Sequence, residues 1–137
     1  MYLSAPVNHY FQPSIEIEAG RARISMPVQP SSFHAAGALH GSVYFKALDD
    51  ACFFAAQANE PAAFVLTACF EVELLAPVTH GVLEAAGEVV ADGRQIEAAA
   101  TLEVGGALVA RGRGSFARSG TGLDEVASYR PAEELLA

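Results

Sequence analysis

Two adjacent carboxylates, Asp49 and Asp50, stand in an otherwise apolar stretch of the chain and are well placed to do chemistry. Residues 43–56 hold eleven apolar side chains among fourteen, and Lys46 is the one other polar member. A carboxylate in such surroundings is costly unless it is paired, solvated or used. If used, it could act as a nucleophile or as a general base that activates water.

The same stretch predicts a helix that is apolar on nearly all sides and therefore buried, because it contains neither Gly nor Pro. The helix should begin at about residues 40–41 and end near residues 57–59, before Pro61. Its free N–H groups at the N-terminus could hold an oxyanion, and Gly41 would let a ligand approach the backbone closely. A second interpretation remains open, in which Gly41 simply permits a tight turn into the helix.

Lys46 precedes Asp49 by three residues and Asp50 by four, so a surface ion pair with either carboxylate is possible. The two carboxylates project in different directions from a helix, and at most one of them can face a site. The residues alone do not decide between them.

The rest of the chain predicts β-structure. Apolar residues alternate through residues 14–28, which indicates two strands with Gly20 at the turn. Four further strands are expected at residues 64–75, 81–90, 94–104 and 107–118, with the spacing of an antiparallel meander. A strongly curved sheet could wrap the apolar helix, giving an α+β fold whose free edges favour pairing of two chains.

The 137 residues predict a single domain with a core at about residues 14–118. Residues 1–12 are expected to form a loosely attached arm, and residues 119–137 a linker and acidic tail with a short helix from Pro131. Cys52 and Cys69 are expected to be reduced core thiols. His9 and His80 are expected at the surface, and the dispersed histidines predict no metal site.

The net charge of −8, with a single Lys, argues against nucleic acid as a partner. The sequence shows neither a membrane-spanning stretch nor a signal peptide, so the expected location is the cytoplasm.

Several short motifs occur along the chain in an order and spacing that are specific when taken together. They are Gly37-x-Leu39-His40-Gly41-Ser42 with Asp49 nine residues after the His, Val65-Leu66-Thr67, Leu75-Ala76-Pro77, Gly81-x-Leu83, Val89-Val90-x-x-Gly93-Arg94 and Ala107-Leu108-Val109-Ala110-x-Gly112. Together they resemble the hotdog-fold acyl-CoA thioesterases of the phenylacetate-degradation type, over about residues 14–118. Two positions depart from that pattern, because Ser42 replaces a second Gly and His34 replaces an Asn or Asp.

The resemblance implies a hotdog fold, with a curved antiparallel sheet of about six strands around one central helix, and hydrolysis of an acyl-CoA to a carboxylate and free CoA. It implies that the Gly41 amide is the oxyanion donor and that Asp49, rather than Asp50, is the nucleophile or general base. His40 would orient the carbonyl or support the loop, and Thr67 and His34 would position water.

Ser42, Arg94, Arg113 and Arg118 are the expected substrate-binding residues, with the arginines near the nucleotide end of CoA. No cofactor is implied, because coenzyme A is part of the substrate. Tyr44, Phe45, Phe53 and Phe54 could line an aryl or medium-chain pocket, although aromatics on such a helix more often belong to the core.

Gly41 and Asp49 lie eight residues apart on one helix, hence about 12 Å along its axis. If both act on one thioester carbon, they must come from different chains, and a homodimer or homotetramer is expected. A hotdog enoyl-CoA hydratase or dehydratase, a non-catalytic acyl-CoA-binding domain and a structural role without ligand remain alternatives.

Overall fold

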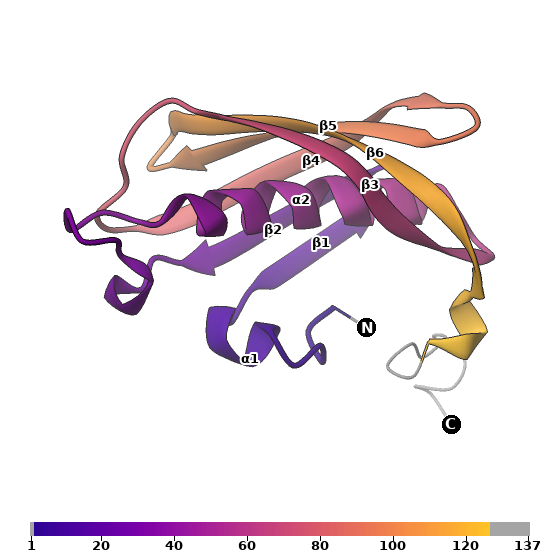
Figure 1. Ribbon diagram of the computed structural model, residues 1–137, viewed down its shortest axis with the longest axis horizontal. Helices are drawn as coiled ribbons and strands as arrows, with labels where there is room; N and C mark the ends of the chain where they lie inside the picture. The colour runs from indigo at the N-terminus through magenta and orange to yellow at the C-terminus, as the bar shows by residue number, and fades with distance from the viewer. Residues whose placement is uncertain (1, 127–137) are drawn as a thin grey trace.

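The structure, a computed structural model, describes residues 2–126 and has an α+β architecture. One curved antiparallel sheet wraps around a central helix, α2 (Gly41–Ala58) (Figure 1). The strands are β1 (Ser14–Glu18), β2 (Arg21–Pro27), β3 (Ala63–Leu74), β4 (Val82–Asp92), β5 (Ile96–Val104) and β6 (Ala107–Gly122). A short helix, α1 (Asn8–Phe11), and the 3₁₀ turns η1 (Pro30–Ser32) and η2 (Leu123–Glu125) complete the described chain. The sequence therefore predicted the class, the order of the main elements and the bounds of α2.

α2 lies directly on the sheet because small residues line the contact. Ala47, Ala51 and Ala55 have no exposed surface. Gly87 on β4 makes this approach possible, since a Cβ there would lie 2.5 Å from the carbonyl oxygen of Ala51. Such a distance is far inside van der Waals contact, so the helix could not keep its position beside any larger residue.

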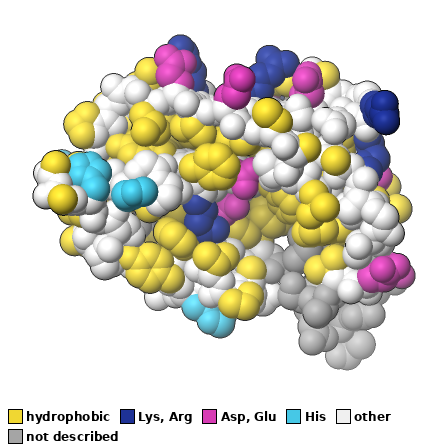
Figure 2. All heavy atoms as spheres, in the orientation of Figure 1, with side chains coloured by type: hydrophobic (Ala, Val, Ile, Leu, Met, Phe, Trp, Pro, Cys, Tyr) yellow, Lys and Arg dark blue, Asp and Glu magenta, His cyan; other side chains and the backbone are white. Residues whose placement is uncertain are grey.

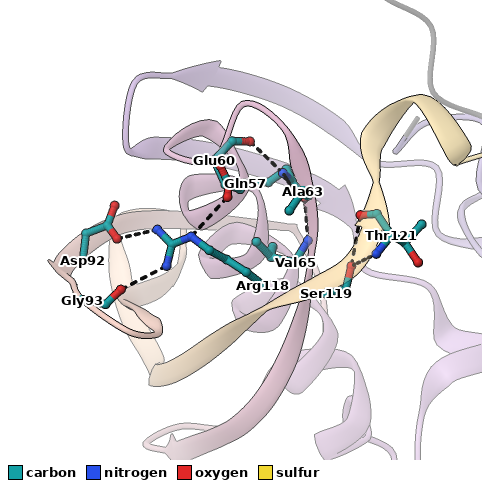
Figure 3. Close-up of polar contacts among 9 residues, drawn as sticks. All are labelled: Gln57, Glu60, Ala63, Val65, Asp92, Gly93, Arg118, Ser119 and Thr121. Carbon is teal, nitrogen blue, oxygen red and sulfur yellow. Dashed lines mark hydrogen bonds and ion pairs between the residues drawn. The ribbon is translucent and has the colours of Figure 1, made fainter.

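The side chain of Gln57 fixes the end of α2 to the start of β3 (Figure 3). Its Oε1 accepts a hydrogen bond from the Val65 amide at 3.0 Å, and its Nε2 donates to the carbonyls of Glu60 and Ala63 at 3.0 and 2.9 Å. Because the donors and the acceptor of this buried amide are all used, the side chain holds the end of α2 and the start of β3 in a fixed relation.

The strand order is β1-β2-β4-β5-β6-β3, which corrects the predicted four-strand meander. Of the four strands predicted to form it, β4, β5 and β6 are neighbours in chain order, whereas β3 pairs with β6 and forms an edge of the described sheet. β1, β2 and β4 cover one side of α2. β3 lies beyond β6 in the strand order and covers the other side of the helix (Figure 1). β6 also runs past its predicted end at residue 118, because its pairing with β3 continues to Gly122.

The N-terminal arm is not loosely attached, contrary to the prediction. Tyr2 is only 7% exposed and packs on Phe54 of α2, with ring centroids 4.7 Å apart. The side chain of Asn8 is buried and donates a hydrogen bond to the Tyr2 carbonyl at 2.8 Å. The arm has no periodic pattern because single residues, rather than a regular face, make its contacts.

The prediction for the thiols is right for one cysteine and wrong for the other. Cys52 is fully buried in α2, whereas Cys69 is exposed on the edge strand β3, where no further strand covers it within residues 2–126. His9 and His80 are exposed, as predicted. The helix expected from Pro131 lies outside the described residues. None of the described helices is both long and apolar enough to span a bilayer.

Candidate active site

One side of α2 runs along β3, and every fourth helix residue on that side meets a residue of the strand. The pairs are Phe45 with Phe70, Asp49 with Thr67, and Phe53 with Phe64. The aromatic rings of the first pair have centroids 5.2 Å apart, and those of the last pair are 5.6 Å apart. Asp49 thus lies in a row of aromatic neighbours, with a strand hydroxyl beside it.

Asp49 is held by Thr67, whose Oγ1 donates a hydrogen bond to Asp49 Oδ1 at 2.9 Å. Partial burial raises the pKa of the Asp49 carboxyl, and the nearby charge of Asp50 adds to this. The Thr67 hydrogen bond and the charge of Lys46 lower the same pKa, but burial prevails. A carboxylate made more basic in this way, at an accessible position, is suited to attack or to proton abstraction.

Asp50 faces the other side of the helix and is already bound. Its Oδ2 receives Lys46 Nζ at 2.7 Å and the Tyr2 hydroxyl at 2.8 Å. The side chains of Lys46 and Asp50 are only 15% and 17% exposed, so the pair is not the surface ion pair that the sequence predicted. The arm covers it, which no local sequence pattern indicated.

The start of α2 combines a side-chain cap with an unused amide. His40 is the N-cap residue, and its Nδ1 accepts a hydrogen bond from the Ser42 amide at 3.1 Å and lies 2.8 Å from Ser42 Oγ. The Gly41 amide makes no hydrogen bond to any residue from 2 to 126. Such an unpaired N–H at a helix N-terminus is a ready donor to an oxyanion.

Neither the backbone nor the packing requires glycine at position 41. The φ angle of Gly41 lies outside the left-handed region, and an added Cβ would touch only Leu74 Cδ1, at an ordinary 3.4 Å. The tight-turn interpretation of Gly41 therefore lacks support, and what the missing side chain provides is open space beside the amide.

His34 shapes the loop before the helix. Its Nδ1 accepts a hydrogen bond from the Ala36 amide at 3.1 Å, and its backbone pairs with Ala38 and Gly37. The ring is exposed, and within residues 2–126 it makes no hydrogen bond to Asp49 or Thr67.

The three arginines expected at the nucleotide end lie in different settings. Arg118 binds Glu60 at 3.1 Å, Asp92 at 2.7 Å and the Gly93 carbonyl at 3.0 Å, and so ties the end of α2 to the β4–β5 turn (Figure 3). Arg113 pairs with Glu97 at 3.2 Å. Arg94 is exposed in the turn itself. No ion pair joins any of these arginines to Asp49 in the described part of the chain.

In a single chain the site is open. Thr67 is exposed, and the neighbouring apolar residues Phe45, Leu66 and Leu74 are 42%, 50% and 54% exposed. Figure 2 shows one face of the molecule, on which exposed hydrophobic side chains surround a small central group of acidic and basic side chains. A hollow of about 1200 Å³ exists elsewhere, among arginine and glutamate side chains of the outer sheet face, and neither Asp49 nor Gly41 lines it.

Sequence reasoning missed Tyr2, Phe70 and Gln57. Tyr2 lies in a stretch without a pattern, and Phe70 gains its place only through the pairing of β3 with β6. The spacing of Gly41, Phe45 and Asp49 along one helix face was the available signal for the row beside β3.

Comparison with known proteins bears on the fold and on the segment that contains α2. Residues 36–96 match the family model described as the thioesterase superfamily. A thioesterase family protein from Silicibacter pomeroyi is 29% identical, with a TM-score of 0.74 over 86% of this chain and 93% of that one. No match to a curated protein is found.

Two further solved structures share the fold at lower identity. The E. coli PaaI protein, from the phenylacetic acid degradation operon, is 21% identical, with a TM-score of 0.81 over 89% of this chain and 90% of that one. A conserved protein from Pseudomonas aeruginosa is 20% identical, with a TM-score of 0.79 over 85% and 96% of the two chains. Its central helix and curved six-stranded sheet give the chain the hotdog fold, and its segment 36–96 is similar to the thioesterase superfamily.

Proposed function

We propose that this protein hydrolyses an acyl-CoA thioester to a carboxylate and free CoA, at a site shared by two copies of the chain. The observation that carries the proposal is the Asp49 carboxylate, held by Thr67 at 2.9 Å on an accessible face of a buried helix. In the proposed reaction the Gly41 amide receives the negative charge that develops on the thioester oxygen.

Asp49 acts in its ionised form, either by attacking the thioester carbon or by taking a proton from the attacking water. The hydrogen bond from Thr67 occupies Oδ1, so in this proposal Oδ2 is the oxygen that reacts. Thr67 and His34 position the water, and His40 fixes the start of the helix through Ser42. In the general-base route water adds to the thioester carbon, the carbon–sulfur bond breaks, and the proton that Asp49 took from water passes to the CoA thiolate. In the nucleophilic route the carbon–sulfur bond breaks as an acyl–Asp49 anhydride forms; water then hydrolyses the anhydride, which releases the carboxylate product, restores Asp49 and supplies the proton for the CoA thiolate.

A second copy is required because the Gly41 amide and the Asp49 carboxylate lie about 12 Å apart along α2. The edge of β3 and the exposed apolar residues beside it provide a surface for that copy. The partial positive charge at the start of one helix also complements the carboxylate of the other. We propose a homodimer as the smallest active unit.

Ser42, Arg94, Arg113 and Arg118 are the proposed contacts to the CoA portion. Ser42 is exposed next to Gly41, and Arg94 is exposed in its turn. Arg113 and Arg118 would have to exchange a carboxylate partner for a phosphate.

The test measures release of free CoA from short, medium, long and aryl acyl-CoAs. Asp49→Ala removes the proposed carboxylate, and Gly41→Pro removes the proposed amide donor. Proline suits the first helical position, and His40 before it has the extended φ of −65° and ψ of 141° that a following proline requires. Each variant should lower turnover by about 100-fold or more.

Glu84→Ala, an exposed carboxylate on β4, is the matched control and should keep wild-type turnover. Wild-type rates in folded Asp49→Ala would remove this residue from the mechanism. Binding of CoA without turnover of any thioester would point instead to a non-catalytic binding domain, and turnover of an enoyl-CoA alone to a hydratase.

Mixed dimers test the shared site. Chains carrying Asp49→Ala and chains carrying Gly41→Pro, each with its own affinity tag, are co-expressed and the mixed species is isolated. One of its two sites then holds an intact Gly41 and an intact Asp49, so about half of the wild-type activity should return. A mixed dimer as inactive as its parents would place both residues of each site in one chain.

A further inference from the structure

The side of α2 opposite β3 carries a second, tightly bound carboxylate group. Asp50 uses a single oxygen, Oδ2, to accept Lys46 Nζ at 2.7 Å and the Tyr2 hydroxyl at 2.8 Å. Asp49, one residue earlier, is bound from the other side by Thr67. Two neighbouring carboxylates are thus pulled to opposite faces of the helix, each by a different element.

The N-terminal arm fixes the position of the Lys46 ammonium. Lys46 Nζ lies 5.6 Å from the centre of the Tyr2 ring and 5.1 Å from that of Phe11. Both distances are within the range of cation–π attraction. The ammonium therefore has two aromatic rings and the Asp50 carboxylate around it, which hold it on the arm side of α2.

This placement matters because Lys46 precedes Asp49 by three helix positions and could reach that carboxylate instead. If it did, it would occupy the oxygen that the proposed reaction needs. If it were absent, the negative charge of Asp50 would stand unbalanced beside Asp49.

We propose that Lys46 and Asp50 are positioning residues of the hydrolytic site: held together by the arm, they balance each other's charge and leave Asp49 as the carboxylate of α2 that has no ion pair. This inference rests on the proposed thioesterase function but does not require a particular acyl group. Neither residue touches the substrate in this proposal, and both act through Asp49.

Two charged neighbours of Asp49, Asp50 and Lys46, act on its pKa in opposite directions. Asp50 raises the pKa of Asp49 and Lys46 lowers it. Cys52, also on α2, is neutral at working pH, because burial and the nearby charge of Asp49 raise its pKa to about 12. From β3 the facing group is the uncharged Thr67, and from the arm it is Tyr2, whose pKa burial raises. Lys46 and Asp50 are therefore the charges to vary.

The experiment compares Lys46→Met, Asp50→Asn and the double variant in the full-length protein. Two quantities are measured: the acidic limb of the pH dependence of kcat/KM, and the pKa of the Asp49 carboxyl by ¹³C NMR without substrate. Lys46→Met should move both upward by about 0.5–1 pH unit, and Asp50→Asn should move both downward by a similar amount. The double variant should return close to wild type.

Two controls isolate the charge effect. Lys46→Arg keeps the cation and should keep the wild-type limb. Arg111→Met removes an exposed cation that pairs with Glu73 at 2.8 Å in the hollow of the outer sheet face, and it should move neither quantity. If Lys46→Met fails to fold, Asp50→Asn alone still decides, because a downward shift is expected from it.

The proposal is overturned if both single variants lower kcat without moving the limb or the Asp49 pKa, since that is the behaviour of a merely structural pair. This result would leave the thioesterase function standing. Conversely, absence of turnover on every acyl-CoA would refute the proposed function, while the NMR titration would still decide the positioning role.

Discussion

At the Asp49 carboxyl, folding changes the balance between the protonated and the ionised form. Burial in the folded chain favours the neutral acid, and the hydrogen bond from Thr67 offsets this only in part. The unfolded chain, which has no such burial, loses the proton at a lower pH. The proposed site therefore holds an ionised group whose charge opposes folding at neutral pH.

Because folding raises the pKa of Asp49, the stability of the protein should depend on pH through this residue. Below the unfolded pKa both states are protonated and Asp49 has no effect on stability; as pH rises, the unfolded state loses its proton first, and the folded state is penalised. Asp49→Asn removes that penalty, so its Tm should exceed that of wild type at pH 7, and the gain should vanish near pH 3. Paired thermal melts at the two pH values measure this. An unchanged or lower Tm at pH 7 would contradict the assigned burial effect.

A second prediction at this scale concerns Tyr2. Replacing this almost fully buried side chain by Ala removes its packing on Phe54 and its bond to Asp50, and should cost about 2–4 kcal/mol of unfolding free energy. The neighbouring Leu3 is 56% exposed, so Leu3→Ala should change the unfolding free energy by less than about 0.5 kcal/mol. Urea denaturation of both variants makes the comparison. Equal, small effects would mean that the arm does not pack on α2 in solution.

At the scale of elements, the contact between α2 and β4 depends on one missing side chain. Gly87→Ala would place a methyl group 2.5 Å from the Ala51 carbonyl oxygen and push the helix off the sheet. The expected cost is about 2–3 kcal/mol of unfolding free energy, together with loss of activity through displacement of Asp49. Chemical denaturation and CoA-release assays measure the two effects.

Gly93→Ala is the matched control, because a Cβ at position 93 meets nothing within 4 Å and the φ angle there is not left-handed. Wild-type stability is expected for it. If Gly87→Ala proved equally harmless, α2 would not lie as close to β4 as described.

The helix and strands were largely predictable from the sequence, whereas the pairing of strands and the contacts between distant elements were not. The apolar run before Asn59 predicted α2, and period-two alternation predicted β1 and β2, because both signals are local. The position of β3 beside β6 depends on which strand closes the sheet around the helix, which no local pattern encodes. For the same reason, the spacing of Gly41 and Asp49 was readable in the sequence, whereas the bond from Tyr2 to Asp50 was not.

For the whole molecule, the shared site fixes a register between two helices. If Gly41 of one chain meets Asp49 of the other, the two copies of α2 run antiparallel and paired residue numbers add up to ninety. Phe45 then faces its own copy across the two-fold axis, in keeping with its exposure of 42%.

Phe45→Cys, in a chain that also carries Cys52→Ala and Cys69→Ser, should therefore form an intermolecular disulfide under mild oxidation. Ala58→Cys in the same background should not, because two copies of residue 58 would lie about 39 Å apart along the helices. Non-reducing electrophoresis separates the two outcomes. Crosslinking at position 58 rather than 45 would rule out this register.

The pairing of β3 with β6 also has a consequence for the order in which the protein is made. Residues 63–74 leave the ribosome well before residues 107–122, so β3 must wait for the last strand of the sheet to be synthesised. During that interval Gln57 can already hold the start of β3 to the end of α2. The hydrogen bond between Thr67 and Asp49 is therefore fully stabilised only after β6 has been synthesised and has paired with β3. Until then the proposed site is not assembled in the nascent chain.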